Sequence, residues 1–298
     1  MKRWVKWVIG AVAVLVLGAA AAVTAGWQMA ANKMARHVDI APHPIAYIDD
    51  TLKLDRGKYL FESRGCADCH GLNGGGRIFV DKPDLRLGGP NITAGGVTAL
   101  YKPEDWERAI RHGVKPTGLP LMVMPSEDYN RLTDADLSAL VSYVRRLPTL
   151  KGGDAVLDMP VPMRVLYGFG AFEDAAAAID HSLPPSQPVE MGVNVKHGAY
   201  VANMCKGCHG VHLSGGKISD GPPDWPPAAN LTPGDGSVMT ARYKDATAFV
   251  AMLHSGKRAD GSAIPVMPFE ALGKLNDVDA QALHAYLLTL PAQAAGGR

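Results

Sequence analysis

The sequence predicts an all-α protein built from two similar domains that follow one N-terminal transmembrane helix. An uncharged apolar segment runs from Trp7 to Trp27, and the second half of the chain repeats motifs of the first half. Both halves end in a segment whose apolar residues recur at helical spacing. No segment shows the alternation of apolar and polar residues that is typical of a half-buried strand.

The N-terminal segment has the charge pattern of a membrane anchor. Lys2, Arg3 and Lys6 precede the apolar run, an arrangement that keeps the N-terminus inside and exports the rest of the chain. The run of about 20 residues is long enough to cross a bilayer, whereas the apolar region of a signal peptide needs only about 7–15 residues. We therefore expect a single-pass anchor over residues 1–30 that is not cleaved.

Two further features bear on this segment. Trp7 and Trp27 stand where aromatic side chains would meet the two membrane interfaces. Val23-Thr24-Ala25 has the small residues of a cleavage site, so a cleaved signal peptide is the alternative. The mixed, proline-containing residues 31–50 are expected to form a tether with little structure of its own.

The pentapeptide C-x-x-C-H occurs twice and contains all four cysteines of the chain, as Cys66-Ala67-Asp68-Cys69-His70 and Cys205-Lys206-Gly207-Cys208-His209. This pattern is the attachment signature of a c-type haem. Its two thiols can each add to one haem vinyl group, and the adjacent histidine then supplies an axial nitrogen to the iron. A zinc site would need four ligands at short paired spacings, and a thioredoxin-type pair would not explain the histidines.

We therefore expect two covalently bound haem c groups, held by the thiols of Cys66, Cys69, Cys205 and Cys208, with His70 and His209 as proximal ligands. Because c-type haem is attached outside the bacterial cytoplasm, the expected location is the bacterial cytoplasmic membrane, with both haem domains in the periplasm.

The internal repeat defines the expected domains. Cys66 and Asn91 recur 139 residues later, whereas Met124-Pro125 and Leu147-Pro148 recur 143 residues later. The slip of four residues falls in a loop, where insertions are tolerated. Two copies are therefore expected at 51–155 and 191–298, joined by a connector at 156–190. We interpret the connector as a strap packed across both domains. The alternative is a docking surface for a partner or the membrane.

The Met-Pro repeat suggests the remaining iron ligands. Met124 and Met267 occupy matching positions just before the last helix of each copy, after proline-containing loops. A thioether ligand raises the haem potential and closes the sixth coordination position. We therefore expect Met124 and Met267 as distal ligands, although Met122 is an alternative in the first copy.

The last helix of each copy has recognisable ends. Thr133 is expected to cap the first, and Leu137, Leu140, Val141 and Val144 form its apolar stripe before Pro148 stops it. Asn276 is expected to cap the second.

The charge balance argues against a nucleic-acid partner. Without the first thirty residues the chain has 27 basic and 29 acidic residues, a net charge of −2. Neither nucleic-acid binding nor strong electrostatic steering is suggested by this balance.

With these motifs in this order, each copy resembles a class I cytochrome c. The whole chain is similar to the cytochrome c subunits of membrane-bound bacterial dehydrogenases that oxidise alcohols, aldehydes or nicotinate, many of which carry three haems where this chain has two motifs. The resemblance implies an electron-transfer protein without catalytic residues. Its donor would be a periplasmic dehydrogenase or quinol-oxidising complex, and its acceptor an oxidase, a soluble cytochrome or the quinone pool.

Two alternatives belong to other functional classes. A dihaem redox enzyme of the peroxidase or thiosulfate dehydrogenase type would need one iron with an open or labile sixth position, which the two Met-Pro motifs argue against. A cytochrome subunit of an oxidase or alternative respiratory complex would be distinguished by the chains that purify with it.

Overall fold

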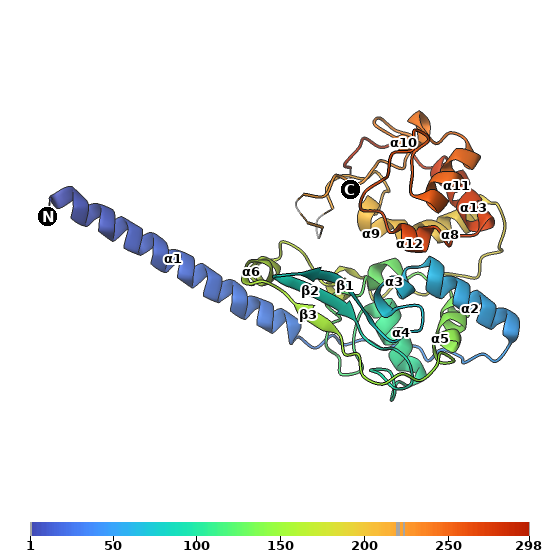
Figure 1. Ribbon diagram of the computed structural model, residues 1–298, viewed down its shortest axis with the longest axis horizontal. Coiled ribbons are helices and arrows are strands. Elements are labelled where there is room, and N and C mark those ends of the chain that lie inside the picture. Colours follow the sequence, from blue (N-terminus) through green and yellow to red (C-terminus); the bar gives the residue numbers. More distant parts are fainter. Residues whose placement is uncertain (1, 219–220, 223, 298) are drawn as a thin grey trace.

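The computed structural model describes residues 2–218, 221–222 and 224–297. A long N-terminal helix, α1 (Arg3–Met34), projects from a body of two lobes (Figure 1). The described elements of the first lobe and the connector are α2 (Thr51–Ser63), α3 (Cys66–His70), β1 (Arg77–Lys82), β2 (Leu85–Gly89), α4 (Pro103–His112), the 3₁₀ turn η1 (Ser126–Asp128), α5 (Asp134–Val144), β3 (Val156–Asp158), α6 (Val161–Phe169) and α7 (Ala175–Ala178). Those of the second lobe are α8 (Val195–Val201), η2 (Ala202–Cys205), α9 (Lys206–His209), α10 (Val238–Ala241), α11 (Ala246–Ser255), α12 (Phe269–Leu272) and α13 (Asp277–Leu287).

Each lobe is built around one close helix crossing at equivalent places in the repeat. Gly57 of α2 lies against α5, where a Cβ would fall 2.1 Å from the Ala139 carbonyl oxygen. Gly198 of α8 lies against α13, where a Cβ would fall 1.9 Å from the Ala282 carbonyl oxygen. Glycine is required at both positions because any side chain would separate the two helices.

The predicted caps of the last helices are confirmed. The Thr133 side chain accepts a hydrogen bond from the Asp136 amide at the start of α5. The Asn276 side chain accepts one from the Asp279 amide at the start of α13. Both caps satisfy amides that the first helical turn leaves without partners. They also fix the position of an aspartate that matters for the contact between the lobes.

The all-α prediction is wrong in one respect, because the first lobe contains a small antiparallel sheet in the order β1-β2-β3. Ile78 pairs with Gly88 and Lys82 with Leu85, and Leu87 of β2 pairs with Leu157 of β3. Two strands are short and glycine-rich or charged, and the third comes from the connector, so local periodicity does not reveal them. In the second lobe, Gly216 and Ala228 form an isolated antiparallel bridge.

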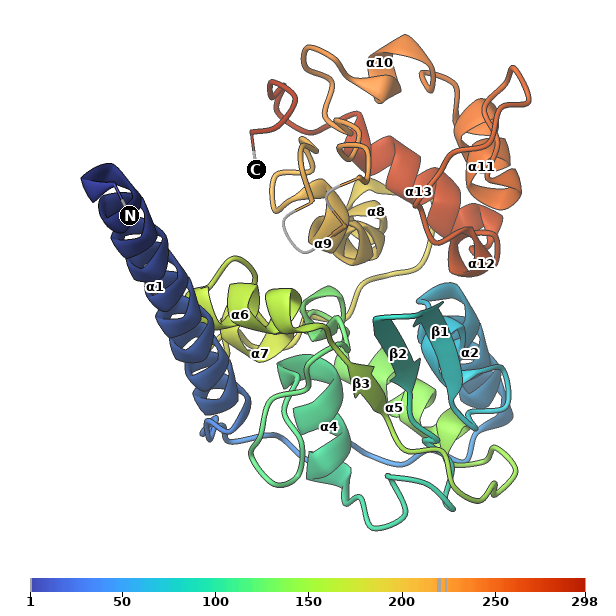
Figure 2. The ribbon, with the colours of Figure 1, turned by 60° about the vertical axis from the view of Figure 1, so that its left-hand side comes forward.

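The long apolar helix α1 is packed onto the connector (Figure 2). α6 crosses α1 so closely that a Cβ at Gly168 would lie 2.0 Å from the Gly26 carbonyl oxygen. Beyond the helix, Arg36 donates two hydrogen bonds to the buried Asp174 carboxylate, at 2.5 and 2.7 Å, and the Tyr167 hydroxyl donates a third at 2.6 Å. The connector therefore fixes the direction in which α1 leaves the body.

The segment expected as a tether lies along the first lobe. Residues 31–34 continue α1, and the remainder has no regular secondary structure. The Val38 amide donates to the Gly118 carbonyl, the Ile48 amide donates to the Ser142 hydroxyl, and Ile45 is buried in the first core. Its position is thus set by contacts with the first lobe.

We expect Gly168→Ala to loosen the contact between α1 and α6. Alanine normally favours a helix over glycine by about 1 kcal/mol, but here its methyl group would overlap the Gly26 carbonyl. The overlap should cost about 1–3 kcal/mol, seen as a lower thermal midpoint and faster proteolysis within residues 35–50 of the full chain in nanodiscs.

Gly18→Ala is the matched control, since a Cβ at Gly18 meets nothing within 4 Å. Equal stability of the two variants would contradict the close crossing.

Candidate haem sites

The two C-x-x-C-H motifs fold as the short helices α3 and η2–α9. In the first, Gly65 precedes the helix and Gly71 follows it, with φ of +80° and +73°. The helical turn places Cys66 and Cys69 three residues apart on one face. None of the four cysteines forms a disulfide. Burial raises the pKa of Cys66 and of Cys205 to about 12.

Both motif histidines are oriented by the same hydrogen bond. His70 Nδ1 lies 2.8 Å from the Pro90 carbonyl oxygen, and His209 Nδ1 lies 2.8 Å from the Ala229 carbonyl oxygen. A carbonyl can only accept, so Nδ1 carries the proton and Nε2 of the neutral ring carries the lone pair. This tautomer is the one that presents Nε2 to a metal, with Nδ1 held by an outer partner.

The loops that hold these carbonyls repeat in detail. The Asn91 side chain accepts hydrogen bonds from the amide and hydroxyl of Thr93, and it donates to the Leu150 carbonyl at 2.7 Å. Asn230 repeats the pattern, accepting from Thr232 and donating to the Gln293 carbonyl at 2.8 Å. These bonds shape the turn that follows each of the two carbonyls.

Each lobe gathers the expected ligands on one apolar core. Cys66 and Met124 pack against the core of the first lobe, which includes Trp106. Cys205 and Met267 pack against the core of the second, which includes Phe249. In each lobe the first motif cysteine and the expected methionine share one core, and the motif histidine is bonded through Nδ1. This donor set fits a covalent haem c with histidine and methionine ligands.

The contact between the lobes repeats with approximate two-fold symmetry, which sequence reasoning missed. The Tyr59 hydroxyl of the first lobe donates to Asp279 of the second at 2.8 Å. The Tyr200 hydroxyl of the second lobe donates to Asp136 of the first at 2.7 Å. These two tyrosines match in the repeat, as do the two aspartates, so each lobe offers the same pair of groups to the other. We call these bonds the crossed tyrosine–aspartate pairs.

Each aspartate of the crossed pairs is also held by a residue of its own lobe. Arg56 forms two hydrogen bonds with Asp136, at 2.8 and 2.9 Å, and His197 Nε2 lies 2.7 Å from Asp279. The buried Arg64 guanidinium adds an ion pair to Asp279 across the interface, at 2.8 Å. With Arg64, His197 and Tyr59 around it, the pKa of Asp279 falls to about 2.

The cysteine-bearing helices lie at this same interface. η1 follows the first Met-Pro and reaches the second lobe, where Asp128 accepts a hydrogen bond from the Gly207 amide at 3.1 Å. α12 follows the second Met-Pro and lies against α3 of the first lobe. The segment after each expected distal ligand therefore contacts the C-x-x-C-H helix of the other lobe.

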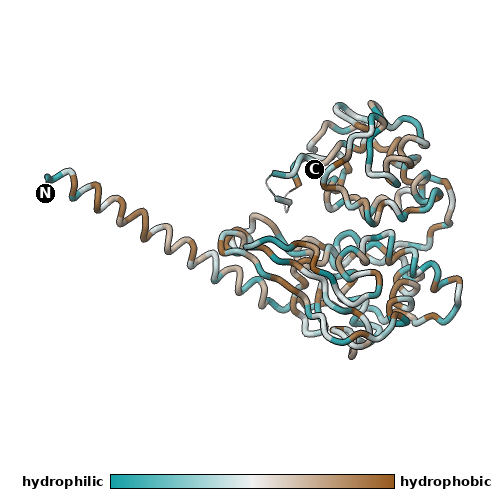
Figure 3. Tube along the Cα trace, in the orientation of Figure 1, coloured by the Kyte–Doolittle hydropathy of each residue, from teal (hydrophilic) through white to brown (hydrophobic). Residues whose placement is uncertain are grey.

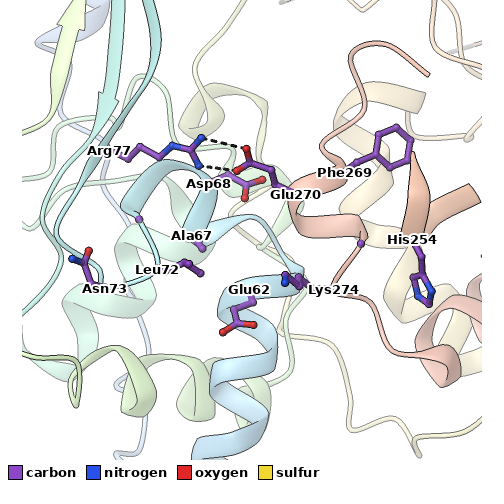
Figure 4. A pocket seen from close by; sticks show the side chains of 12 residues that line it. Glu62, Ala67, Asp68, Leu72, Asn73, Arg77, His254, Phe269, Glu270 and Lys274 are labelled. Carbon is purple, nitrogen blue, oxygen red and sulfur yellow. Dashed lines mark hydrogen bonds and ion pairs between the residues drawn. The ribbon is translucent and has the colours of Figure 1, made fainter. Parts of the chain in front are cut away.

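A cleft of about 740 Å³ opens beside α3 (Figure 4). It is lined from one side by Glu62, Asp68 and Leu72 and from the other by Phe269 and Lys274. The exposed ion pair between Arg77 and Glu270 closes one end at 2.7 Å. Because its walls come from both lobes, the cleft depends on the crossed tyrosine–aspartate pairs.

Comparison with known proteins agrees with this geometry. The family model of cytochrome c matches the chain twice, at residues 54–148 and 195–291. The chain is 27% identical to the fructose dehydrogenase cytochrome subunit of Gluconobacter japonicus over 279 residues, covering 82% of this chain and 54% of that protein. It is 26% identical to the gluconate 2-dehydrogenase cytochrome c subunit of Pantoea cypripedii over 271 residues, covering 80% and 59%.

A shorter match of 34% identity over 99 residues relates the chain to the cbb3-type cytochrome c oxidase subunit CcoP of Helicobacter pylori, covering 33% of this chain and 29% of that protein. The chain thus spans little more than half the length of the two dehydrogenase subunits that it matches.

We expect Asp279→Asn to destabilise the contact between the lobes in a pH-dependent way. The native pKa of Asp279 is about 2, below the ordinary 3.8, so its carboxylate stabilises the fold by about 2 kcal/mol above pH 4. That contribution is lost as the pH falls through about 2. The unfolding free energies of wild type and variant should therefore differ at pH 7 and converge toward pH 2.

Asp277→Asn in the same helix is the matched control, because its side chain is 71% exposed. A constant difference between wild type and Asp279→Asn across this pH range would contradict the assigned role.

Proposed function

Since this chain belongs to the cytochrome c family, we propose that it is a membrane-anchored dihaem cytochrome that relays electrons into a respiratory chain. The observation that carries the proposal is the duplicated site, in which each lobe holds a C-x-x-C-H helix, a carbonyl-oriented histidine and a methionine on one core. When bound, haem c supplies reversible one-electron chemistry at its iron.

The protein's own residues have separate tasks in this proposal. Cys66 and Cys69 bind the first haem covalently, and Cys205 and Cys208 bind the second. His70 and His209 ligate the iron through Nε2, held in place by the Pro90 and Ala229 carbonyls. Met124 and Met267 fill the sixth positions, which leaves no site for oxygen or peroxide and makes the chain an electron carrier without an active site of its own.

The crossed tyrosine–aspartate pairs hold the two lobes in contact, which is what electron transfer between them requires. They hold the cysteine-bearing helix of each lobe against the other lobe, so the residues that would bind both haems lie near one interface. The buried charges of Arg64 and Asp279 offset each other at that interface, since they are paired at 2.8 Å. Electrons would therefore pass from lobe to lobe within one chain.

The relatives suggest the donor. Two of them are named as cytochrome subunits of fructose and gluconate dehydrogenases. We propose a periplasmic dehydrogenase or quinol-oxidising complex as the donor here, with an oxidase, a soluble cytochrome or the quinone pool as acceptor. α1 would hold the chain in the bacterial cytoplasmic membrane, and both haem domains would lie in the periplasm.

The match to a cbb3-type oxidase subunit supports a second candidate, a cytochrome subunit of an oxidase. The two candidates differ in the partner chain. Purification of the native complex in mild detergent should yield a dehydrogenase subunit for the first candidate and an oxidase core subunit for the second.

We expect two covalent haems per chain. The mass of the denatured protein should exceed the chain mass by two haem groups, and removal of Cys66 and Cys69 together should leave one. A single haem in the wild-type protein would contradict the dihaem proposal.

We expect both irons to have methionine ligands. The ferric protein should show the weak red-edge absorption of iron–thioether coordination, with an intensity corresponding to both haems. Met124→Ala and Met267→Ala should each remove about half of that band and lower the potential of one haem, since a thioether favours the ferrous state.

Met122→Ala is the matched control, because Met122 lies two residues from Met124 in the same loop. Loss of the band in Met122→Ala would move the assignment to that residue, and a band for one haem only in the wild type would support the dihaem enzyme instead.

A further inference from the structure

The length of α1 sets where the membrane surface would lie. The helix is uncharged between Lys6 and Lys33 and is not buried in the body over its most apolar stretch. At about 1.5 Å per residue, Trp7 to Trp27 spans about 30 Å, the thickness of the hydrocarbon core. Figure 3 shows α1 strongly hydrophobic along most of its length and paler where it reaches the body. Trp27 therefore marks the outer interface of the bilayer.

α6 is fixed at this same level. Val165 and Phe169 pack around Gly26, and Gly168 lies against the Gly26 carbonyl. The Arg164 guanidinium stacks over the Trp27 ring, 4.4 Å from its centroid. Three side chains and one backbone contact thus hold α6 beside the residue that marks the interface.

α6 leaves apolar side chains partly exposed beside α1. Val161, Leu166 and Phe169 are 48%, 51% and 52% exposed. The one charged residue of α6 is Arg164, which is engaged with Trp27. Exposed apolar side chains on a helix at this depth are typical of a segment that contacts the membrane surface.

We propose that α6 lies in the interfacial layer of the membrane and that Val161, Leu166 and Phe169 contact lipid. We identify the contacting surface as lipid because α6 is continuous with the membrane contact of α1. A helix packed against Trp27 lies in the same interfacial layer as Trp27. The inference rests on the proposed anchoring by α1 and adds a second membrane contact. With Arg36 and Asp174 bonded just beyond, the two contacts together fix the tilt of the first lobe against the membrane.

Spin labels at single introduced cysteines test this in the full chain with its haems attached. Leu166→Cys is labelled in nanodiscs of phosphatidylcholine and phosphatidylglycerol, and its collision rates with oxygen and with a water-soluble nickel chelate are compared. Leu100→Cys, at a site that is 91% exposed in a loop of the first lobe, serves as the aqueous reference, and Val14→Cys in α1 serves as the lipid reference. An unchanged haem spectrum shows that each variant is folded.

The expected result is an oxygen-to-nickel accessibility ratio at Leu166 several-fold above that at Leu100 and approaching that at Val14. A ratio at Leu166 equal to that at Leu100, with Val14 in lipid, would overturn the proposal and leave α6 as a surface for a protein partner. Equal aqueous ratios at all three sites would instead show that α1 does not anchor the chain.

Discussion

The crossed tyrosine–aspartate pairs are the constraint on which the arrangement of the two lobes depends. The Asp279 side chain is 1% exposed and that of Asp136 is 13% exposed, and a carboxylate withdrawn from water in this way is tolerated only when its charge and lone pairs are satisfied. Each receives a tyrosine hydroxyl from the opposite lobe. Separation of the lobes would leave both carboxylates without one of their hydrogen-bond donors, so the contact is specific to this arrangement.

The same interface also supports the two loops that carry Met124 and Met267. η1 and α12 directly follow Met124-Pro125 and Met267-Pro268, and each contacts the cysteine-bearing helix of the other lobe. A loop that would otherwise be free at the surface is thus held from both sides, by its own core and by the neighbouring lobe. This support suits an iron ligand, because ligand orientation depends on the groups around it.

The sequence predicted the parts of the fold that are local. The apolar helix α1, the caps at Thr133 and Asn276 and the duplicated motifs follow from spacing and capping chemistry within a few residues. The local hairpin of β1 and β2 was missed because these short strands lack a clear alternation of apolar and polar residues. β3 was missed because it pairs with β2, about seventy residues earlier in the chain. The crossed pairs were missed for a different reason. The repeat reveals that Tyr59 and Tyr200 match, but it cannot show that each tyrosine bonds an aspartate of the other copy.

When the same surface patch on two copies forms the contact, the pair has closed two-fold symmetry and leaves no such patch free. The matched tyrosines and aspartates give the two lobes the arrangement of a symmetric homodimer whose subunits have been joined into one polypeptide. Duplication of a gene for a self-associating domain, followed by fusion, would produce this chain directly, and the two copies would need no newly evolved interface. The closed symmetry also means that this patch cannot recruit a third copy, which limits such an assembly to a pair.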